Sequence, residues 1–145
     1  MYPHKKFHND IKPDAKPTYS RPYSIPQIHM STFKKELNHL VELGVLLPQN
    51  ESEWASPTFI IPKNDGRVRR VSDLRQLNKV IKRKQCPLPI ITEVLQKRVG
   101  YKFFTKMDIS MQYYTFELYN ESQDLCTICT LFVMYKYARL PMGFK

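Results

Sequence analysis

The apolar and polar positions of the chain change their spacing several times, which indicates that helices and strands share one chain. Between 31 and 43 the apolar residues recur at helical spacing and form one face. Ser31 is a candidate N-cap, and Gly44 stands where helices commonly end. The pattern therefore predicts a helix over about 31–43. Its apolar face consists of Phe33, Leu37, Leu40 and Val41.

The next segment has the features of a β-hairpin. An apolar run at 58–61 precedes the turn sequence Asn-Asp-Gly at 64–66, and a second strand-like segment follows at 67–72. Pro62 suits the end of a strand or the edge of a sheet, because proline has no backbone N–H to donate.

The second half of the chain predicts a short helix at about 92–99, closed by Gly100, and then several strands. Helix, hairpin, helix and strands in this order indicate an α+β fold. Residues 1–27 hold five prolines and no glycine, so we expect an extended or partly disordered leader there. The strand-like runs lie at 103–109, 113–119, 126–132 and 133–140.

Charge changes this picture more than composition does. The 145 residues suit one domain, and 42% of them are hydrophobic, which is ordinary for a globular protein. Thirteen basic residues between Lys63 and Lys106 face three acidic ones, which accounts for the whole net charge of +10. A cluster of this size fits a polyanion such as nucleic acid, and a solubilising surface is the alternative.

Several classes of protein are not expected from the sequence. No apolar run approaches the length of a membrane span and the N-terminus lacks a signal sequence, so we expect no membrane partner and an intracellular location. Three cysteines, Cys86, Cys126 and Cys129, are too few for a disulfide framework. Cys126 and Cys129 lie three apart in a strand-like run, so we expect no zinc or redox site.

The stretch FFTKMDIS, residues 103–110, places Asp108 inside a run with the character of a buried strand. An ionised carboxylate is costly to bury unless it is paired, hydrogen-bonded or bound to a cation. Asp108 is therefore either a strand-end residue that reaches water or a ligand of a metal such as Mg²⁺, which prefers oxygen donors. Glu117 is expected on a solvent face rather than at such a site.

Two further positions are candidates for nucleotide chemistry. Lys63 and Arg69 flank the predicted turn, and a lysine and an arginine together can grip a triphosphate. An ordinary charged hairpin explains them equally well. Tyr113 could stack on a sugar or base, although tyrosine is also a plain β-former.

A series of segments between Arg21 and Lys145 resembles the reverse transcriptase domain of gypsy-type LTR retrotransposons, which is similar to the retroviral domain. The third segment contains the D-x-R-x-L-N signature from Asp73 to Asn78. The segments are RPYSIP, LVELGVLLPQNESEWASP, IIPKNDGRVRRVSDLRQLNK, CPLPIITEVL, FFTKMDIS and YKYARLPMGF.

The resemblance implies that 28–145 form the fingers and the first part of the palm of a right-hand polymerase. By motif position, Asp108 resembles the first catalytic and metal-binding aspartate, with Mg²⁺ as cofactor. Lys63 and Arg69 then grip the incoming dNTP, and Tyr113 discriminates against a 2′-hydroxyl. The basic residues then contact an RNA/DNA primer–template. They are Arg67, Arg70, Arg75, Lys79, Lys82, Arg83 and Lys84.

The chain departs from the family pattern at several points. Gln112 replaces a small residue beside the sugar, Met142 stands where retroviral enzymes resemble one another in using glutamine, and Leu131 and Val133 stand where a proline and a glycine are common. The sequence ends at Lys145, before a Tyr-x-Asp-Asp hairpin.

We therefore expect a fragment of an RNA-directed DNA polymerase that is inactive alone, with its missing carboxylates in the remainder of a Pol polyprotein. A nucleic-acid-binding module and a non-functional relic of a retroelement are the alternatives.

Overall fold

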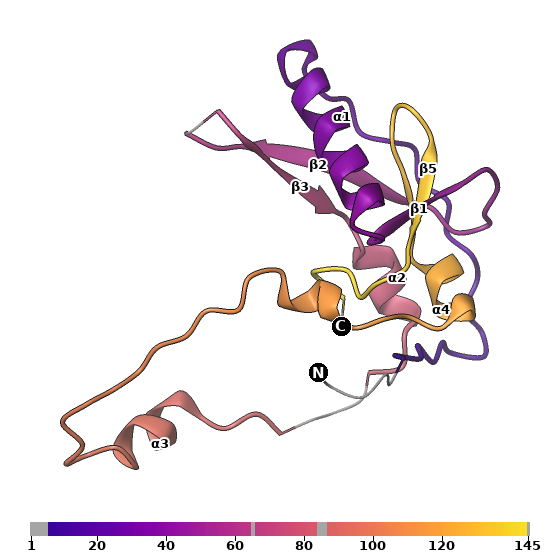
Figure 1. Ribbon diagram of the computed structural model, residues 1–145. Helices are drawn as coiled ribbons and strands as arrows, with labels where there is room; N and C mark the ends of the chain where they lie inside the picture. The colour runs from indigo at the N-terminus through magenta and orange to yellow at the C-terminus, as the bar shows by residue number, and fades with distance from the viewer. Residues whose placement is uncertain (1–5, 65, 84–86, 145) are drawn as a thin grey trace.

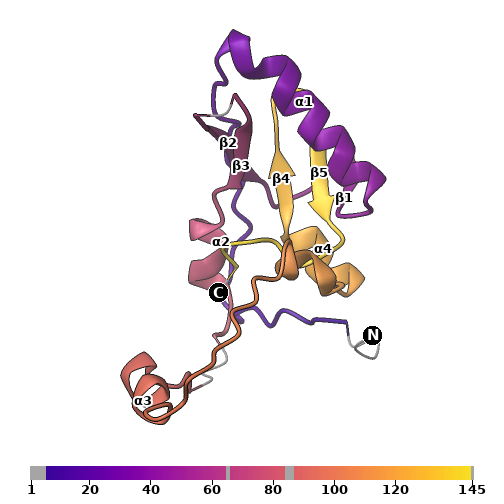
Figure 2. The ribbon, with the colours of Figure 1, turned by 60° about the vertical axis from the view of Figure 1, so that its left-hand side comes forward.

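The computed structural model describes residues 6–64, 66–83 and 87–144. Figures 1 and 2 show a packed body and an arm, residues 87–111, that extends away from it. The body comprises the remaining described residues. The predictions for Lys84 and Cys86 lie outside the described residues.

A five-stranded sheet in the order β1-β5-β4-β2-β3 forms the centre of the body. Neighbouring strands are antiparallel except β2 and β4, which are parallel through the pairs Ser56–Ile128 and Pro57–Cys129. The α+β prediction is therefore confirmed. The strands are β1 Leu46–Gln49, β2 Ser56–Pro62, β3 Val68–Ser72, β4 Thr127–Cys129 and β5 Met134–Tyr137.

Helix α1, Gln27–Glu42, lies along the sheet (Figure 2) and confirms the helix predicted there. It begins after Pro26, whose extended ψ of 137° precedes the first turn, so the prediction of Ser31 as N-cap is wrong. It ends as predicted at Gly44, where φ is 65° and Val45 N–H bonds to Leu40 O. The buried residues of its apolar face are Phe33, Leu37 and Leu40.

The predicted hairpin is also confirmed. Strands β2 and β3 pair from Thr58–Ser72 to Pro62–Val68, so Pro62 stands at a strand end. Lys63 N–H donates to Arg67 O at 2.8 Å and closes the turn. Gly66 has φ 77°, which suits a residue without a Cβ.

Beyond the hairpin, the sequence prediction fails in part. The strand predicted at 103–109 is wrong, because this run has no strand partner among the described residues and every residue from 101 to 110 is exposed. The strand predicted at 113–119 is also wrong, because this segment overlaps the 3₁₀ helix η1, Gln112–Thr115, and has only isolated bridges at Glu117 and Leu118. The runs at 126–132 and 133–140 contain the shorter strands β4 and β5.

Three short helices complete the fold. Helix α2, Arg75–Val80, follows the hairpin, and α4, Asn120–Leu125, replaces a polar turn in the sequence prediction. Helix α3, Ile91–Gln96, confirms the predicted helix of the arm in a shorter form and buries none of its residues. No helix in the described part of the chain is long and apolar enough to cross a membrane.

Residues 6–26 run along the body with extended backbone. Phe7 bridges to Leu118, Ile11 to Ile81, and Tyr19 to Ala55. Asn9 N–H also donates to Ser122 Oγ at 2.9 Å. The division into a leader at 1–27 and a partial domain at 28–145 stays a prediction.

Candidate nucleotide and nucleic-acid site

Strand β3 sends two neighbouring arginines in different directions, because side chains alternate along a strand. Arg69 is exposed, and its Nη2 lies 3.3 Å from Met142 Sδ. Arg70 points into the body, where its Nη1 donates to Tyr137 Oη at 2.6 Å and its Nη2 to Tyr114 Oη at 3.1 Å. Only Arg69 thus presents its charge outward.

Arg70 on β3 contacts residues of two other elements, β5 and η1. Its guanidinium lies 5.4 Å from the centre of the Tyr137 ring, and that ring stacks on Tyr114 with 6.5 Å between centroids. Burial alone would lower the pKa of Arg70, but the Tyr137 and Tyr114 oxygens outweigh burial and leave that pKa raised. Arg70 therefore holds β3 against β5 and η1. These contacts give it a structural role, and its predicted contact with nucleic acid stays a prediction.

The segment 141–144 lies beside the hairpin and α2. Pro141 is fully buried, and Asn78 Nδ2 donates to Gly143 O at 2.9 Å. Together with the contact between Arg69 and Met142, this bond places 141–144 against the hairpin and α2, which lie 65 to 73 positions earlier in the sequence. Sequence reasoning missed these contacts, since spacing in the chain says nothing of which motifs meet.

The four named residues of the D-x-R-x-L-N signature all make contacts within the fold. Asp73 accepts from Arg75 Nε at 2.8 Å and from Arg75 Nη2 at 2.7 Å, and this pairing lowers the pKa of Asp73 to about 2. Leu77 is buried in the core, and Asn78 reaches Gly143. Arg75 keeps 81% of its side chain exposed, so one face of its guanidinium remains open to solvent.

Lys63 and Tyr113, the other candidates for nucleotide binding, occupy separate elements. Lys63 is exposed at the tip of the hairpin, which projects from the body in Figure 1. Tyr113 lies in η1 and is 46% exposed, next to the exposed Gln112. The backbone of η1 is held by Arg139 Nη1, which donates to Tyr114 O at 3.1 Å.

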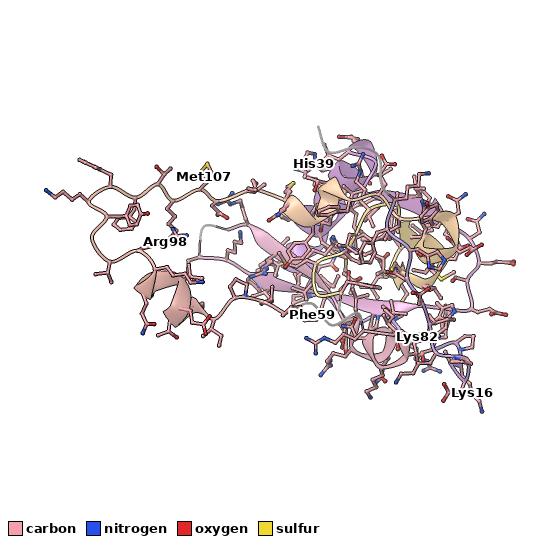
Figure 3. The ribbon with its side chains drawn as sticks, turned by 90° about the horizontal axis from the view of Figure 1, so that it is seen from below. Lys16, His39, Phe59, Lys82, Arg98 and Met107 are labelled. Carbon is pink, nitrogen blue, oxygen red and sulfur yellow. The ribbon has the colours of Figure 1, made fainter. Side chains whose placement is uncertain are left out.

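The remaining basic residues do not form one patch. Arg67 is exposed at the hairpin turn, while Lys79, Lys82 and Arg83 are exposed at the end of α2 and just beyond it. Figure 3 shows Lys82 on the body and Arg98 on the arm. The basic window therefore divides among the hairpin tip, the α2 region and the arm.

Asp108 lies on the arm and is exposed, so the expected buried surroundings of this residue are wrong. The choice between a residue that reaches water and a ligand of a metal therefore stays a prediction. Within the described ranges, no group of three His, Cys, Asp or Glu residues could hold a metal ion. One carboxylate alone does not fit Mg²⁺, and we derive no chemical step through a metal.

The remaining candidates for chemistry, one carboxylate and two thiols, make contacts that suit a structural role. Glu117 is exposed as predicted, and its Oε1 lies 3.8 Å from Arg139 Nη2. Burial raises the pKa of the Cys126 thiol, which disfavours the reactive thiolate. Cys129 Sγ donates to Ser20 O at 3.0 Å, and both cysteines are free and buried.

Comparison with known proteins identifies relatives that match most of the chain. A retrovirus-related Pol polyprotein from transposon 412 of Drosophila melanogaster is 28% identical over 138 residues, which cover 91% of this chain and 11% of that protein. The crystal structure of a prototype foamy virus protease–reverse transcriptase has a TM-score of 0.81 at 28% identity and covers 99% of this chain and 20% of that chain. No family model matches the chain.

A foamy viral protease–reverse transcriptase in complex with an RNA/DNA hybrid has the same fold, with a TM-score of 0.75 at 21% identity over 100% of this chain and 20% of that chain. This chain spans about a tenth of the length of the curated relatives that it matches. In sequence and in fold it resembles a reverse transcriptase-like region of retroelement Pol polyproteins.

Proposed function

We propose that the chain is the fingers and first palm part of an RNA-directed DNA polymerase from a gypsy-type LTR retrotransposon. The observation that carries this proposal is the superposition of 99% of the chain on the foamy virus protease–reverse transcriptase, at a TM-score of 0.81 and 28% identity. The order of the sequence motifs from the hairpin to 141–144 supports it independently.

In this function, Lys63 and Arg69 bind the triphosphate of the incoming dNTP, and Tyr113 lies against its sugar. Two contacts support this assignment. Arg69 is exposed next to Met142, and Arg70 ties the same strand to Tyr114, which neighbours Tyr113. The hairpin and η1 are thus linked through one partly buried side chain.

The proposed metal is Mg²⁺, with Asp108 as one of its ligands. Reverse transcriptase-like relatives imply a divalent cation, which supplies charge stabilisation at the transferred phosphate when it is bound. Asp108 alone cannot hold such an ion, so we propose that the 145 residues do not polymerise by themselves. The remainder of a Pol polyprotein would provide the further carboxylates.

The proposed partner is an RNA/DNA primer–template. The foamy viral protein of the same fold binds an RNA/DNA hybrid, and this chain carries a net charge of +10. Exposed cations near α2 are available for phosphates, among them Lys82 and Arg83. Binding of this kind falls steeply with salt, because each neutralised phosphate releases counterions.

Fluorescence anisotropy with a labelled RNA/DNA primer–template tests the binding part of the proposal. The chain should bind, and raising the salt from about 50 to about 200 mM should weaken binding strongly. Lys82→Ala should reduce the slope of log affinity against log salt by roughly one, while Lys35→Ala on α1 serves as the matched control. Equal slopes for both variants would remove the α2 region from the interface.

A chimera tests the catalytic part. The chain replaces the matching fifth of the foamy virus protease–reverse transcriptase, and primer extension is measured with Mg²⁺. Asp108→Asn should abolish extension and keep primer–template binding, whereas Asp14→Asn should change neither. Extension by the Asp108→Asn chimera would show that Asp108 is not a metal ligand. If the chimera with Asp108 intact binds primer–template and does not extend it, the result favours a nucleic-acid-binding module instead.

A further inference from the structure

The turn that carries Tyr113 begins with the left-handed backbone of Met111. Met111 has φ 53° and ψ 29°, and among the described residues it is the one non-glycine residue with a positive φ. A residue with a Cβ adopts this conformation at a cost, and the conformation persists where surrounding contacts hold it. Contacts from outside the turn must therefore keep it in place.

Tyr114 closes the turn and is held at three of its polar atoms. Its N–H donates to Met111 O at 3.0 Å, its carbonyl oxygen accepts from Arg139 Nη1 at 3.1 Å, and its hydroxyl accepts from Arg70 Nη2 at 3.1 Å. The Tyr114 ring also stacks on Tyr137, with 24° between the ring planes. Both ends of Tyr114 are thus tied to arginines of other elements.

Gln112 and Tyr113 are the two residues that this turn encloses. Tyr113 is 46% exposed, so packing fixes its ring only in part, and the backbone on either side decides its direction. Thr115 Oγ1 donates to Gln112 O at 2.6 Å and closes the turn from its far end. A shift of the Tyr114 carbonyl would therefore turn the Tyr113 ring.

Arg139 holds the turn through the fork of its guanidinium. Its Nη1 donates to Tyr114 O at 3.1 Å, and its Nη2 lies 3.8 Å from Glu117 Oε1. The backbones of 116–118 and 138–140 bond to each other and fix the chain just after the turn. Arg139 extends this attachment to a carbonyl inside η1. A lysine has a single nitrogen and cannot span both acceptors with the same geometry.

We propose that Arg139 is a positioning residue for selection of the nucleotide sugar. It holds the carbonyl of Tyr114 while Arg70 holds the hydroxyl, and together they keep the Tyr113 ring where its bulk excludes a 2′-hydroxyl. This inference rests on the proposed function, in which Tyr113 lies against the sugar of the incoming dNTP. Exclusion by a clash requires a fixed ring, because a ring that can turn away no longer rejects the ribonucleotide.

Arg139 and Arg70 differ in what their loss should change. Arg70 is partly buried and also bonds to Tyr137, so its loss affects the fold as well as the turn. The side chain of Arg139 is 32% exposed and that of Glu117 is 47% exposed, and a surface ion pair of this kind contributes little to stability. Arg139 is therefore the residue at which the position of Tyr113 can be separated from the stability of the fold.

Nucleotide selection by the chimera with the foamy virus protease–reverse transcriptase tests the inference. The measure is the ratio of kcat/KM for dCTP to kcat/KM for CTP, with Mg²⁺ and a primer–template that presents guanine. Arg139→Ala should lower this ratio about tenfold through a lower KM for CTP, with kcat for dCTP close to that of the wild type. Arg139→Lys should give an intermediate ratio, because it keeps one donor for Tyr114 O.

Lys136→Ala is the matched control. Lys136 lies on β5, three residues before Arg139, and its Nζ pairs with Asp124 Oδ1 at 2.9 Å. The variant removes a cation–carboxylate pair from the same part of the chain without touching η1. Its dCTP-to-CTP ratio should equal that of the wild type.

A double-mutant cycle separates positioning from a direct contact with the nucleotide. Tyr113→Ala should lower the ratio further than Arg139→Ala, since it removes the ring. In the Tyr113→Ala chimera, Arg139→Ala should change the ratio by less than about twofold, because no ring is left to position. Additive effects of the two substitutions would overturn the inference.

Fluorine NMR of the 145-residue chain labelled with 3-fluorotyrosine tests the positioning without polymerisation. Tyr113→Phe assigns the Tyr113 signal among those of the nine tyrosines. Arg139→Ala should shift or broaden that signal, and Lys136→Ala should leave it unchanged. Thermal unfolding shows whether each variant is folded. Arg139→Lys, which keeps the charge, carries both tests if Arg139→Ala does not fold.

The outcomes separate the inference from the function on which it rests. An unchanged Tyr113 signal in the Arg139 variant overturns the positioning role, whether or not the chimera is active. A changed signal with an unchanged dCTP-to-CTP ratio in an active chimera overturns the role in sugar selection and leaves the proposed function standing. A chimera that extends with neither nucleotide while Asp108 is intact overturns the proposed function, and the role in sugar selection falls with it.

Discussion

The body and the arm contain similar apolar side chains and expose them to opposite degrees. Phe33 on α1 is fully buried, whereas Phe103 on the arm is 90% exposed. In the body, a helix and a sheet pack around Phe33. In the arm, a single layer of chain leaves Phe103 uncovered. An apolar run therefore becomes a core strand only where other elements cover it, and its own composition does not decide the outcome.

The first way to test this contrast is to make the same truncation in both regions. Phe33→Ala should lower the free energy of unfolding by about 3–5 kcal/mol, because it leaves a cavity in a packed core. Phe103→Ala should change it by less than about 0.5 kcal/mol at low protein concentration, because the ring is in solvent. Urea unfolding followed by circular dichroism measures both values. Similar losses would show that the arm is packed in solution.

Arginines provide the second test. Arg70→Met should cost roughly 2 kcal/mol of unfolding free energy, because it leaves the Tyr114 hydroxyl without this donor and the Tyr137 hydroxyl with Ser72 Oγ as its remaining partner. Arg98→Met on the arm removes the same charge and should stay within about 0.5 kcal/mol of the wild type. Thermal unfolding of the two variants side by side decides whether Arg70 is a structural residue.

The smallest expected effect concerns a carboxylate and pH. Arg75 lowers the pKa of Asp73 from 3.8 to about 2, so this carboxylate stabilises the fold above pH 3.8 and loses that contribution as the pH falls towards about 2. The contribution should be about 1 kcal/mol or less, because Arg75 is largely in solvent.

Asp73→Asn should therefore lower the unfolding free energy at neutral pH and converge with the wild type near pH 2. Asp108→Asn on the arm is the control, since that residue is exposed and distant from the core elements. Urea titrations at several pH values measure the difference, and a constant gap between Asp73→Asn and the wild type would contradict the assignment to Asp73.

Local signals in the sequence predicted the best part of the fold. The apolar face of α1, its end at Gly44 and the β2–β3 hairpin follow from spacing and turn residues that act within a few positions. The strand predicted at 103–109 failed because a strand needs a neighbour, and no local pattern reports whether one exists. The cap at Ser31 failed because Pro26 had already set the start of the helix.

The candidate site also has features that the local sequence predicts and features that it does not. The motif positions of Lys63, Arg69 and Tyr113 could be read from the sequence, but their surroundings could not. Arg69 and Arg70 are indistinguishable in sequence, and only the direction of β3 sends one to Met142 and the other to Tyr137. The contact between Asn78 and Gly143 joins residues that lie 65 positions apart, beyond the reach of any spacing rule.

The leader has a consequence for synthesis of the chain on the ribosome. Asn9 donates to Ser122, 113 positions later, and Phe7 bridges to Leu118. Residues 7–9 therefore gain these native contacts only after residues 118–122 have left the exit tunnel. Contacts of such long range close slowly, because the intervening chain loses much conformational freedom. Nascent chains should thus keep residues 7–9 accessible to chaperones and proteases until residues 118–122 have emerged.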